Sequence, residues 1–163
     1  MTPPLAIVAI GVPGSGKTTF LKGLAEERGL VYINKDDIRE EMLGDVNDQS
    51  KNRAVWLESE RRITEALEAG SSVALDSTYA ERWKRTELIA SLKKRGAARV
   101  IGAYFDIPHD QAHAQNRERP RVVGDASMEW FRTQFEKERP SLAEGFDALY
   151  RYDELEKLVN ELP

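Results

Sequence analysis

One octapeptide near the N-terminus constrains this chain more than any other stretch. Residues 11–18 read Gly-Val-Pro-Gly-Ser-Gly-Lys-Thr, which is the pattern G-x-x-x-x-G-K-T. Its glycines allow a tight turn in which backbone N–H groups face an anion at close range. The lysine can reach the β- and γ-phosphates of a nucleotide, and the threonine hydroxyl can ligate Mg²⁺. The pattern is that of a P-loop and predicts a site for a nucleoside triphosphate.

The segments on either side of the octapeptide have the character that a P-loop requires. Residues 5–10, Leu-Ala-Ile-Val-Ala-Ile, form an apolar run typical of a buried parallel strand. Behind the motif, an apolar stripe at helical spacing runs from Phe20 to Ala25 and ends at Gly29. This strand–loop–helix context favours phosphate binding over a glycine-rich turn that binds nothing.

The same alternation continues along the chain. Further strands are expected over residues 30–34, 72–76, 99–106 and 148–152, separated by helical patterns that include 51–69 and 81–95. We therefore predict an α/β fold, a P-loop NTPase-type three-layer α/β/α sandwich with a central, mostly parallel sheet. Residues 1–163 are expected to form a single domain. Trp56 and Trp83 are expected to face the core from their helices.

Polar residues follow two of the predicted strands. Asn34 leads into Lys35-Asp-Asp-Ile-Arg39, and Asp76 ends the strand over residues 72–76. In such sheets ligands lie outside the carboxyl ends of the strands, so both clusters should border one crevice. Asp36 or Asp37 can instead cap the following short helix. For Asp76, contact with metal, with substrate or with a helix N-terminus all remain open.

An arginine-bearing segment follows the fourth strand. A helix should begin after Pro108 and run into Asn116-Arg-Glu-Arg-Pro-Arg121, and a second helix should follow with Ser127 as its cap. Helix, arginine-bearing turn and helix is the layout of a lid over ATP phosphates, which we place at about residues 115–127. The alternative is a solvated turn. His109 and His113 have zinc-site spacing, but their surroundings do not favour a metal site.

Composition excludes several classes of protein and of site. The net charge is −4, which argues against a protein that coats nucleic acid electrostatically while leaving room for a local basic groove. The chain has no cysteine, so disulfides and thiolate metal sites are excluded. It shows no basic leader and no apolar run long enough for a membrane span. We expect a cytoplasmic protein with no membrane partner, and leave homo-oligomerisation open.

From Ile7 to about Phe146, the pattern resembles the polynucleotide 5′-hydroxyl kinases of phage and bacterial end-healing enzymes, within the P-loop kinases. The P-loop is shared by many kinases. More telling is Ile33-Asn-Lys-Asp-Asp-Ile-Arg39, because that family carries a similar asparagine, basic residue, two aspartates and arginine after its second strand. The resemblance implies transfer of a phosphoryl group from ATP, with Mg²⁺, to the 5′-hydroxyl end of DNA or RNA.

The resemblance also implies roles for single residues. Asp36 would be the general base, Arg39 would hold the phosphate on the 3′ side of the acceptor nucleotide, and Asp76 would lie in the acceptor pocket. Lys17 and the lid residue Arg119 would stabilise the charge on the moving phosphoryl group. Thr18 would hold Mg²⁺. The ATP site would comprise Gly11, Pro13, Gly14, Ser15, Gly16, Lys17, Thr18, Thr19 and Arg119.

Two features depart from that family. Its lids usually carry an arginine just before the asparagine, where this chain has Gln115; Arg117 could substitute from a neighbouring angle, and whether Gln115 or Arg117 takes a lid role is left open. Phage enzymes also carry a phosphatase domain, whose D-x-D-G-T sequence is missing here. The resemblance thus implies a kinase alone.

Two other functions fit the same motifs. A small-molecule kinase, acting on a sugar, an antibiotic or a nucleotide-sugar, would use the P-loop, Asp36 and the lid equally well, and would differ in the pocket around Arg39 and Asp76. A nucleotide-binding regulatory ATPase would bind ATP without transfer to any acceptor.

Overall fold

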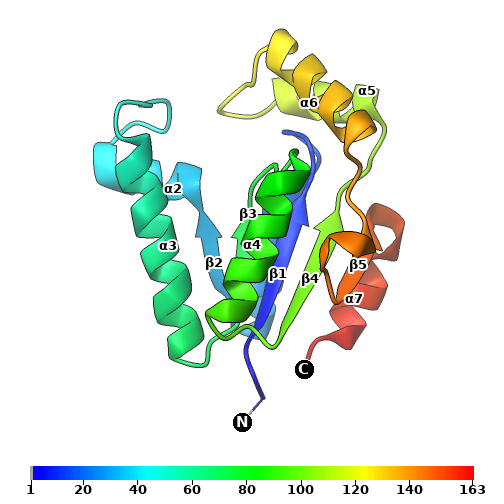
Figure 1. The fold of residues 1–163 in the computed structure, drawn as a ribbon. Coiled ribbons are helices and arrows are strands. Elements are labelled where there is room, and N and C mark those ends of the chain that lie inside the picture. Colours follow the sequence, from blue (N-terminus) through cyan, green and yellow to red (C-terminus); the bar gives the residue numbers. More distant parts are fainter. Residues whose placement is uncertain (1) are drawn as a thin grey trace.

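The computed structural model describes residues 2–163 and is built on a five-stranded sheet in which every strand pair is parallel. The strand order is β2-β3-β1-β4-β5 (Figure 1). The strands are β1 (Leu5–Ile10), β2 (Val31–Asn34), β3 (Val73–Asp76), β4 (Arg99–Tyr104) and β5 (Ala148–Arg151). A wholly parallel sheet is slightly more regular than the mostly parallel one that the sequence predicts.

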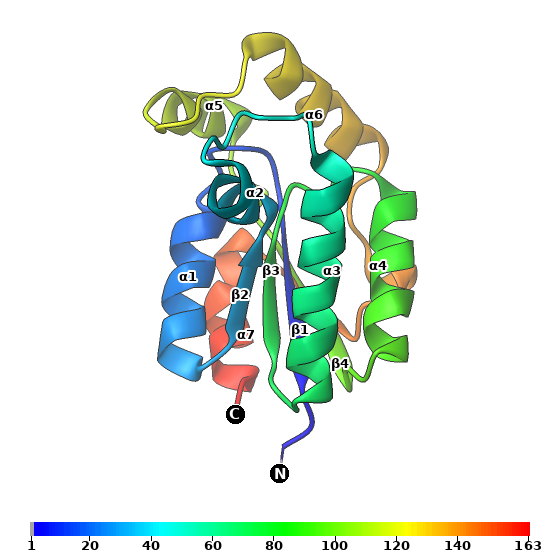
Figure 2. The same ribbon diagram turned by 90° about the vertical axis from the view of Figure 1, so that its left-hand side faces the viewer.

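Helices cover both faces of the sheet. The helices are α1 (Lys17–Arg28), α2 (Lys35–Leu43), α3 (Asn52–Glu68), α4 (Arg82–Lys94), α5 (His109–Arg117), α6 (Asp125–Lys137) and α7 (Leu155–Glu161), with short 3₁₀ turns η1 (Leu142–Glu144) and η2 (Tyr152–Glu154). Figure 2 shows α1 and α7 on one side of the sheet and α3 and α4 on the other. The predicted three-layer α/β/α sandwich is confirmed.

The central strand β1 explains the apolar run before the P-loop. All six of its residues are buried, and it pairs with β3 on one side and β4 on the other. Its side chains point alternately into two cores, because each face of the sheet is covered by helices. An uninterrupted apolar strand is therefore required here, and it fixes the end of β1 where the phosphate loop begins.

Helices α5 and α6 lie above the carboxyl edge of the sheet (Figures 1 and 2). Their connecting turn is closed by Asn116, which is 1% exposed. Its Nδ2 donates to Val123 O at 2.7 Å, and its Oδ1 accepts from Val123 N at 3.0 Å. The two helices also contact each other through His109–Glu129 and His113–Asp125, at 3.3 and 3.1 Å.

Two tryptophans expected in the core are exposed. Trp56 is 45% exposed because α3 turns Val55 and Ser59 inward instead. Trp83 is 55% exposed, since it lies about 200° around α4 from the inward position taken by Arg85. Arg85 is fully buried and pairs with Glu144 of η1 at 2.7 Å. An ion pair occupies a place where the apolar pattern predicted an indole ring.

The predicted cap of α6 is wrong, and the alternative that an aspartate caps α2 is not what the structure shows. Helix α6 begins at Asp125, two residues before Ser127, which is therefore inside the helix. Helix α2 is capped by neither aspartate: the Asn34 side chain accepts from the backbone N–H groups of Asp36 and Asp37 at 2.8 and 3.3 Å. Because Asn34 caps α2, both aspartate side chains are free to make other contacts.

Among the described residues, no helix is both long and apolar enough to cross a bilayer.

Candidate nucleotide and acceptor site

The phosphate loop connects the end of β1 to the start of α1. Gly14 and Gly16 have φ values of +83° and +94°, which L side chains rarely adopt. At Gly14 space is also limiting, since an added Cβ would lie 2.4 Å from Ala112 O and 2.7 Å from Asn116 N. Gly14 therefore permits both the turn of the loop and the close approach of α5 to it.

Lys17 begins α1 and folds back over its own loop. Its Nζ donates to Gly11 O at 2.7 Å and to Val12 O at 2.8 Å, and only 7% of the residue is exposed. Burial lowers the pKa of Lys17 to about 8, although the negative charge of Asp76 raises it, and the positive charge of Arg119 lowers it further. The Lys17 ammonium is thus held within the loop and poorly solvated. It loses its proton at a pH closer to neutrality than a free lysine does.

Asp76 lies beside the loop at the carboxyl end of β3. Its Oδ2 accepts from the Thr18 hydroxyl at 2.7 Å, from the Tyr32 hydroxyl at 2.5 Å and from Asn34 Nδ2 at 3.1 Å. Burial and the carboxylate of Asp76 raise the pKa of Tyr32, so its hydroxyl remains a donor. Three residues from α1 and β2 thus orient one carboxylate. Within residues 2–163, the hydrogen bonds to Asp76 all come from side chains, and none comes from the backbone N–H of a helix N-terminus.

The residues at this point suit a magnesium ion that is shared with a nucleotide. The described part of the chain contains no group of three or more His, Cys, Asp or Glu side chains able to hold a metal by themselves. Mg²⁺ in phosphoryl-transfer sites commonly uses one or two protein oxygens, water and substrate phosphates. Thr18 donates its hydroxyl hydrogen to Asp76 and so keeps its oxygen lone pairs for such an ion. Thr18 and Asp76 fit this arrangement.

Asp36 begins the second part of the site, on the first turn of α2. Its Oδ1 accepts from Arg39 Nη1 at 2.7 Å. Arg39 is 8% exposed and also donates Nη2 to Asn52 Oδ1 at 3.2 Å, which ties α2 to the start of α3. The neighbouring Asp37 points elsewhere and lies 3.7 Å from Lys22. Only one of the two adjacent aspartates therefore takes part in this cluster.

The turn between α5 and α6 contributes its three arginines unequally. Arg121 Nη1 donates to Asp36 Oδ2 at 2.6 Å. Arg119 is half-buried, and burial lowers its pKa, as does Arg121, while Asp36 and Asp76 raise it. Its charge acts on Lys17. Arg117 is exposed at the end of α5, with no hydrogen bond or ion pair found within residues 2–163.

The structure brings together most of the predicted residues, and adds others. Lys17, Thr18 and Asp76 form one cluster, and Asp36 and Arg39 form another. No orienting role was predicted for the partners of these residues, which are Tyr32, Asn34, Asn52 and Arg121. Asn34 and Arg121 did carry a signal, as members of the motif after the second strand and of the arginine cluster. Tyr32 and Asn52 are ordinary polar residues, and their partners Asp76 and Arg39 lie 44 and 13 positions away in the sequence.

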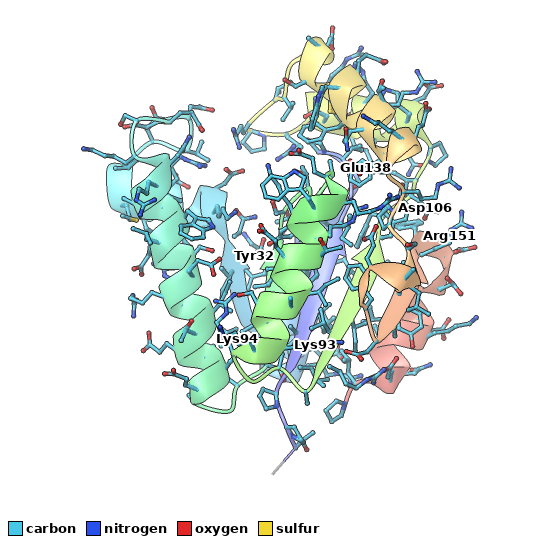
Figure 3. The ribbon with its side chains drawn as sticks, viewed as in Figure 1. Tyr32, Lys93, Lys94, Asp106, Glu138 and Arg151 are labelled. Atoms are coloured by element: carbon cyan, nitrogen blue, oxygen red, sulfur yellow. The ribbon has the colours of Figure 1, made fainter. Side chains whose placement is uncertain are left out.

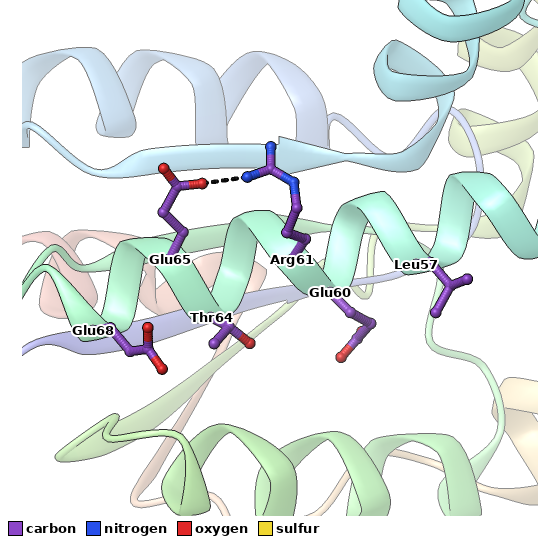
Figure 4. A pocket seen from close by; sticks show the side chains of 6 residues that line it. All are labelled: Leu57, Glu60, Arg61, Thr64, Glu65 and Glu68. Carbon is purple, nitrogen blue, oxygen red and sulfur yellow. Dashed lines mark hydrogen bonds and ion pairs between the residues drawn. The ribbon is translucent and has the colours of Figure 1, made fainter.

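Surface hollows do not mark the site. A hollow of about 480 Å³ lies along α3 between Leu57 and Glu68 (Figure 4), where Arg61 and Glu65 pair across one helical turn. A second, of about 350 Å³, includes Val12 of the phosphate loop and Asp106. Figure 3 shows Asp106, Arg151 and Glu138 where α5 and α6 join the sheet. Arg151 pairs there with Asp106 at 2.6 Å. The first hollow is a solvated helix surface.

Solved structures share this fold at low sequence identity. A chain of the Pnkp1/Rnl/Hen1 RNA repair complex matches 86% of this chain with a TM-score of 0.76 and 19% identity; the chain spans 47% of its length. A kinase candidate from Chloroflexus aurantiacus matches 98%, with a TM-score of 0.74, 20% identity and 94% of its own length covered. A sugar kinase from Janibacter sp. HTCC2649 matches 97%, with a TM-score of 0.64, 21% identity and 91% covered.

The fold is accordingly that of the P-loop kinases. The sequence also matches the model of a protein family, in agreement with the P-loop and the geometry around it. The model of the AAA domain family matches residues 7–140, which is most of the chain. The chain belongs to the AAA domain family.

Proposed function

We propose that this protein is a kinase that transfers the γ-phosphoryl group of ATP to the 5′-hydroxyl end of DNA or RNA. The observation that carries this proposal is the Asp36 carboxylate, held between Arg39 and Arg121 at the edge of the sheet where the phosphate loop also lies. A carboxylate so placed can serve an acceptor hydroxyl as a general base.

The donor side follows from the phosphate loop. Backbone N–H groups of residues 11–18 and the N-terminus of α1 would surround the β- and γ-phosphates. Lys17 would leave its own loop carbonyls and donate to the phosphate oxygens. Thr18 and Asp76 would hold Mg²⁺, which when bound would supply positive charge to the phosphates. Arg119 would add a fixed positive charge from the turn between α5 and α6.

The acceptor side favours a substrate that carries its own phosphate. Two guanidinium groups flank Asp36, and they exceed the single charge of that carboxylate. Arginine binds phosphate oxygens in a bidentate manner, so a nucleotide with a 3′-phosphate would use this surplus charge. A neutral sugar would not. This is why we favour a polynucleotide end over a small neutral acceptor.

The reaction requires a group that accepts the proton of the hydroxyl and groups that stabilise the negative charge on the transferred phosphoryl group. The 5′-oxygen attacks the γ-phosphorus while the bond from that phosphorus to the β–γ bridging oxygen breaks, which releases ADP. Asp36 orients the attacking hydroxyl and takes its proton late in the step, before passing it to solvent. Lys17 and Arg119 stabilise the charge on the equatorial oxygens.

A small-molecule acceptor remains the second candidate function. The Janibacter sugar kinase and a gluconokinase from Sinorhizobium meliloti 1021 are each covered to 91% of their length, compared with 47% for the repair-complex chain. Similar overall size favours this alternative, and fold likeness alone does not decide an acceptor. A regulatory ATPase would bind ATP at the same loop but transfer nothing.

An acceptor panel tests the proposal. The purified protein is given γ-labelled ATP and Mg²⁺ with short 5′-hydroxyl DNA, 5′-hydroxyl RNA, the same oligonucleotides already carrying a 5′-phosphate, gluconate and neutral sugars. We expect label on 5′-hydroxyl oligonucleotides alone. Label on gluconate or a sugar, with none on oligonucleotides, would establish the second candidate. Bound ATP with no transfer to any acceptor would favour the regulatory ATPase.

A further inference from the structure

Arg121 connects two segments that are far apart in the chain. It lies in the turn between α5 and α6, and its partner Asp36 lies on α2, 85 positions earlier. The side chains are 33% and 35% exposed. An ion pair that is this open contributes little to overall stability. Its place beside the candidate acceptor site therefore calls for an explanation other than folding.

The geometry at Asp36 suggests what the pair does. Arg39 donates to Oδ1 from within α2, and Arg121 donates to Oδ2 from the opposite side. With each oxygen held by a different arginine, the carboxylate group has a fixed plane. Each oxygen retains a further lone pair, which an acceptor hydroxyl can use. The orientation of the carboxylate thus depends on where the α5–α6 turn lies.

We propose that Arg121 is a positioning residue of the acceptor site, and that it makes the orientation of Asp36 depend on closure of the α5–α6 turn. The proposal rests on the function assigned to Asp36 above. Of the arginines in the turn, only Arg121 donates a hydrogen bond to Asp36, whereas the charge of Arg119 acts on both Lys17 and Asp36. A turn that is open would leave the base held by Arg39 alone.

Kinetics of three variants test the proposal. In Arg121→Gln we expect the turnover number with the acceptor to fall about tenfold, the effect of losing one charge-assisted hydrogen bond. The KM for ATP should stay close to that of the wild type. Arg121→Lys should recover part of the loss, because it keeps the charge but not the planar fork. Arg132→Gln, which changes an exposed arginine of α6, is the control and should behave as wild type.

A second measurement needs no acceptor. The chain has no cysteine, so a pair of cysteines can be introduced for spin labels. Met42→Cys on α2 and Val122→Cys beside Arg121 are suitable, since these residues are 44% and 54% exposed. Pulsed electron–electron double resonance between the two spin labels then gives the distribution of distances between α2 and the turn. Arg121→Gln should broaden this distribution or shift it to longer distances, and Arg132→Gln should not.

The outcomes are separable. If Arg121→Gln matches Arg132→Gln in both measurements, or raises the KM for ATP without lowering turnover, the proposal is overturned. If the wild type labels no oligonucleotide, the polynucleotide assignment fails. The distance measurement would still decide whether Arg121 holds the turn to α2, and kinetics with the true acceptor would decide its effect on turnover.

Discussion

Lys17 and Asp36 both lie at the carboxyl edge of the sheet, but the segments that hold them differ. Lys17 belongs to one continuous stretch, anchored between the fully buried β1 and the helix α1. Asp36 depends on Arg39 of its own helix, on Asn52 of α3 through Arg39, and on Arg121 of the α5–α6 turn.

This difference predicts how the two parts respond to change. The donor part is built by local sequence on a rigid core, so its geometry should persist in the absence of substrates. The acceptor part is assembled from three segments with large sequence separation, one of them a solvent-exposed turn. Changes in the turn should therefore alter acceptor use before they alter nucleotide binding.

In the donor part, the largest effect is expected from Lys17→Ala. Removal of the only lysine in the phosphate loop should lower kcat/KM for transfer by about 10³-fold, because a charge aimed at the moving phosphoryl group is lost. Lys22→Ala, an exposed lysine of the same helix, is the control and should retain activity. Steady-state kinetics with labelled ATP measure both. Near-normal turnover of Lys17→Ala would contradict the assignment of Lys17 and its loop to the ATP phosphates.

Gly14→Ala should disturb the contact between the two parts. The new Cβ would meet backbone atoms of α5 and would force a positive φ on alanine, at a cost of about 1–3 kcal/mol in stability. In contrast, Gly23→Ala on the exposed side of α1 meets no atom within 4 Å and should stabilise by about 0.5–1 kcal/mol. Urea unfolding compares the two. Equal midpoints would contradict the close packing of α5 on the loop.

ATP affinity should fall as the pH rises through about 8, the pKa to which burial lowers Lys17. Below that pH the ammonium is charged and attracts phosphate; above it the neutral amine predominates, while the phosphates stay ionised. The loss should approach tenfold per pH unit at most. Calorimetric titration from pH 7 to 9.5 measures it. Lys17→Arg, charged throughout, should show no such fall, and a flat profile for the wild type would refute the effect.

The smallest effect is expected from Asn34→Ala. This change removes the cap of α2 and a hydrogen bond to Asp76, which should cost about 1 kcal/mol in stability. We expect acceptor turnover to fall more than ATP affinity, because α2 carries Asp36. Asn47→Ala, in the polar connection after α2, serves as control for thermal unfolding and kinetics. A larger loss of ATP affinity than of turnover would contradict the separation of the two parts.

The sequence predicted the strand, the loop and the helix of the donor part, since these segments are adjacent and their periodicities are strong. Strand and helix positions followed from buried apolar runs, with the exceptions of Trp56 and Trp83. Those two faced outward because helix phase is set by all inward residues together, and a buried Arg85–Glu144 pair cannot be read from an apolar pattern.

For the acceptor part, the sequence predicted some of the residues but not the contacts between them. Asp36 and Arg39 are three residues apart on one helix, so their pairing is local. The contact of Arg121 with Asp36 depends on how a turn 85 residues later folds over the sheet. No pattern in a single sequence specifies such a distance, and the Asn34 cap was missed because the adjacent aspartates are equally good caps.

The most direct test of the account compares the two neighbouring aspartates. Asp36→Asn and Asp37→Asn are each measured for ATP binding and for transfer of labelled phosphate to a 5′-hydroxyl oligonucleotide. We predict that Asp36→Asn binds ATP normally and loses about 10²–10⁴-fold in transfer, while Asp37→Asn keeps both. Near-normal transfer by Asp36→Asn, or equal losses in the two variants, would contradict the assignment of Asp36 as the acceptor base.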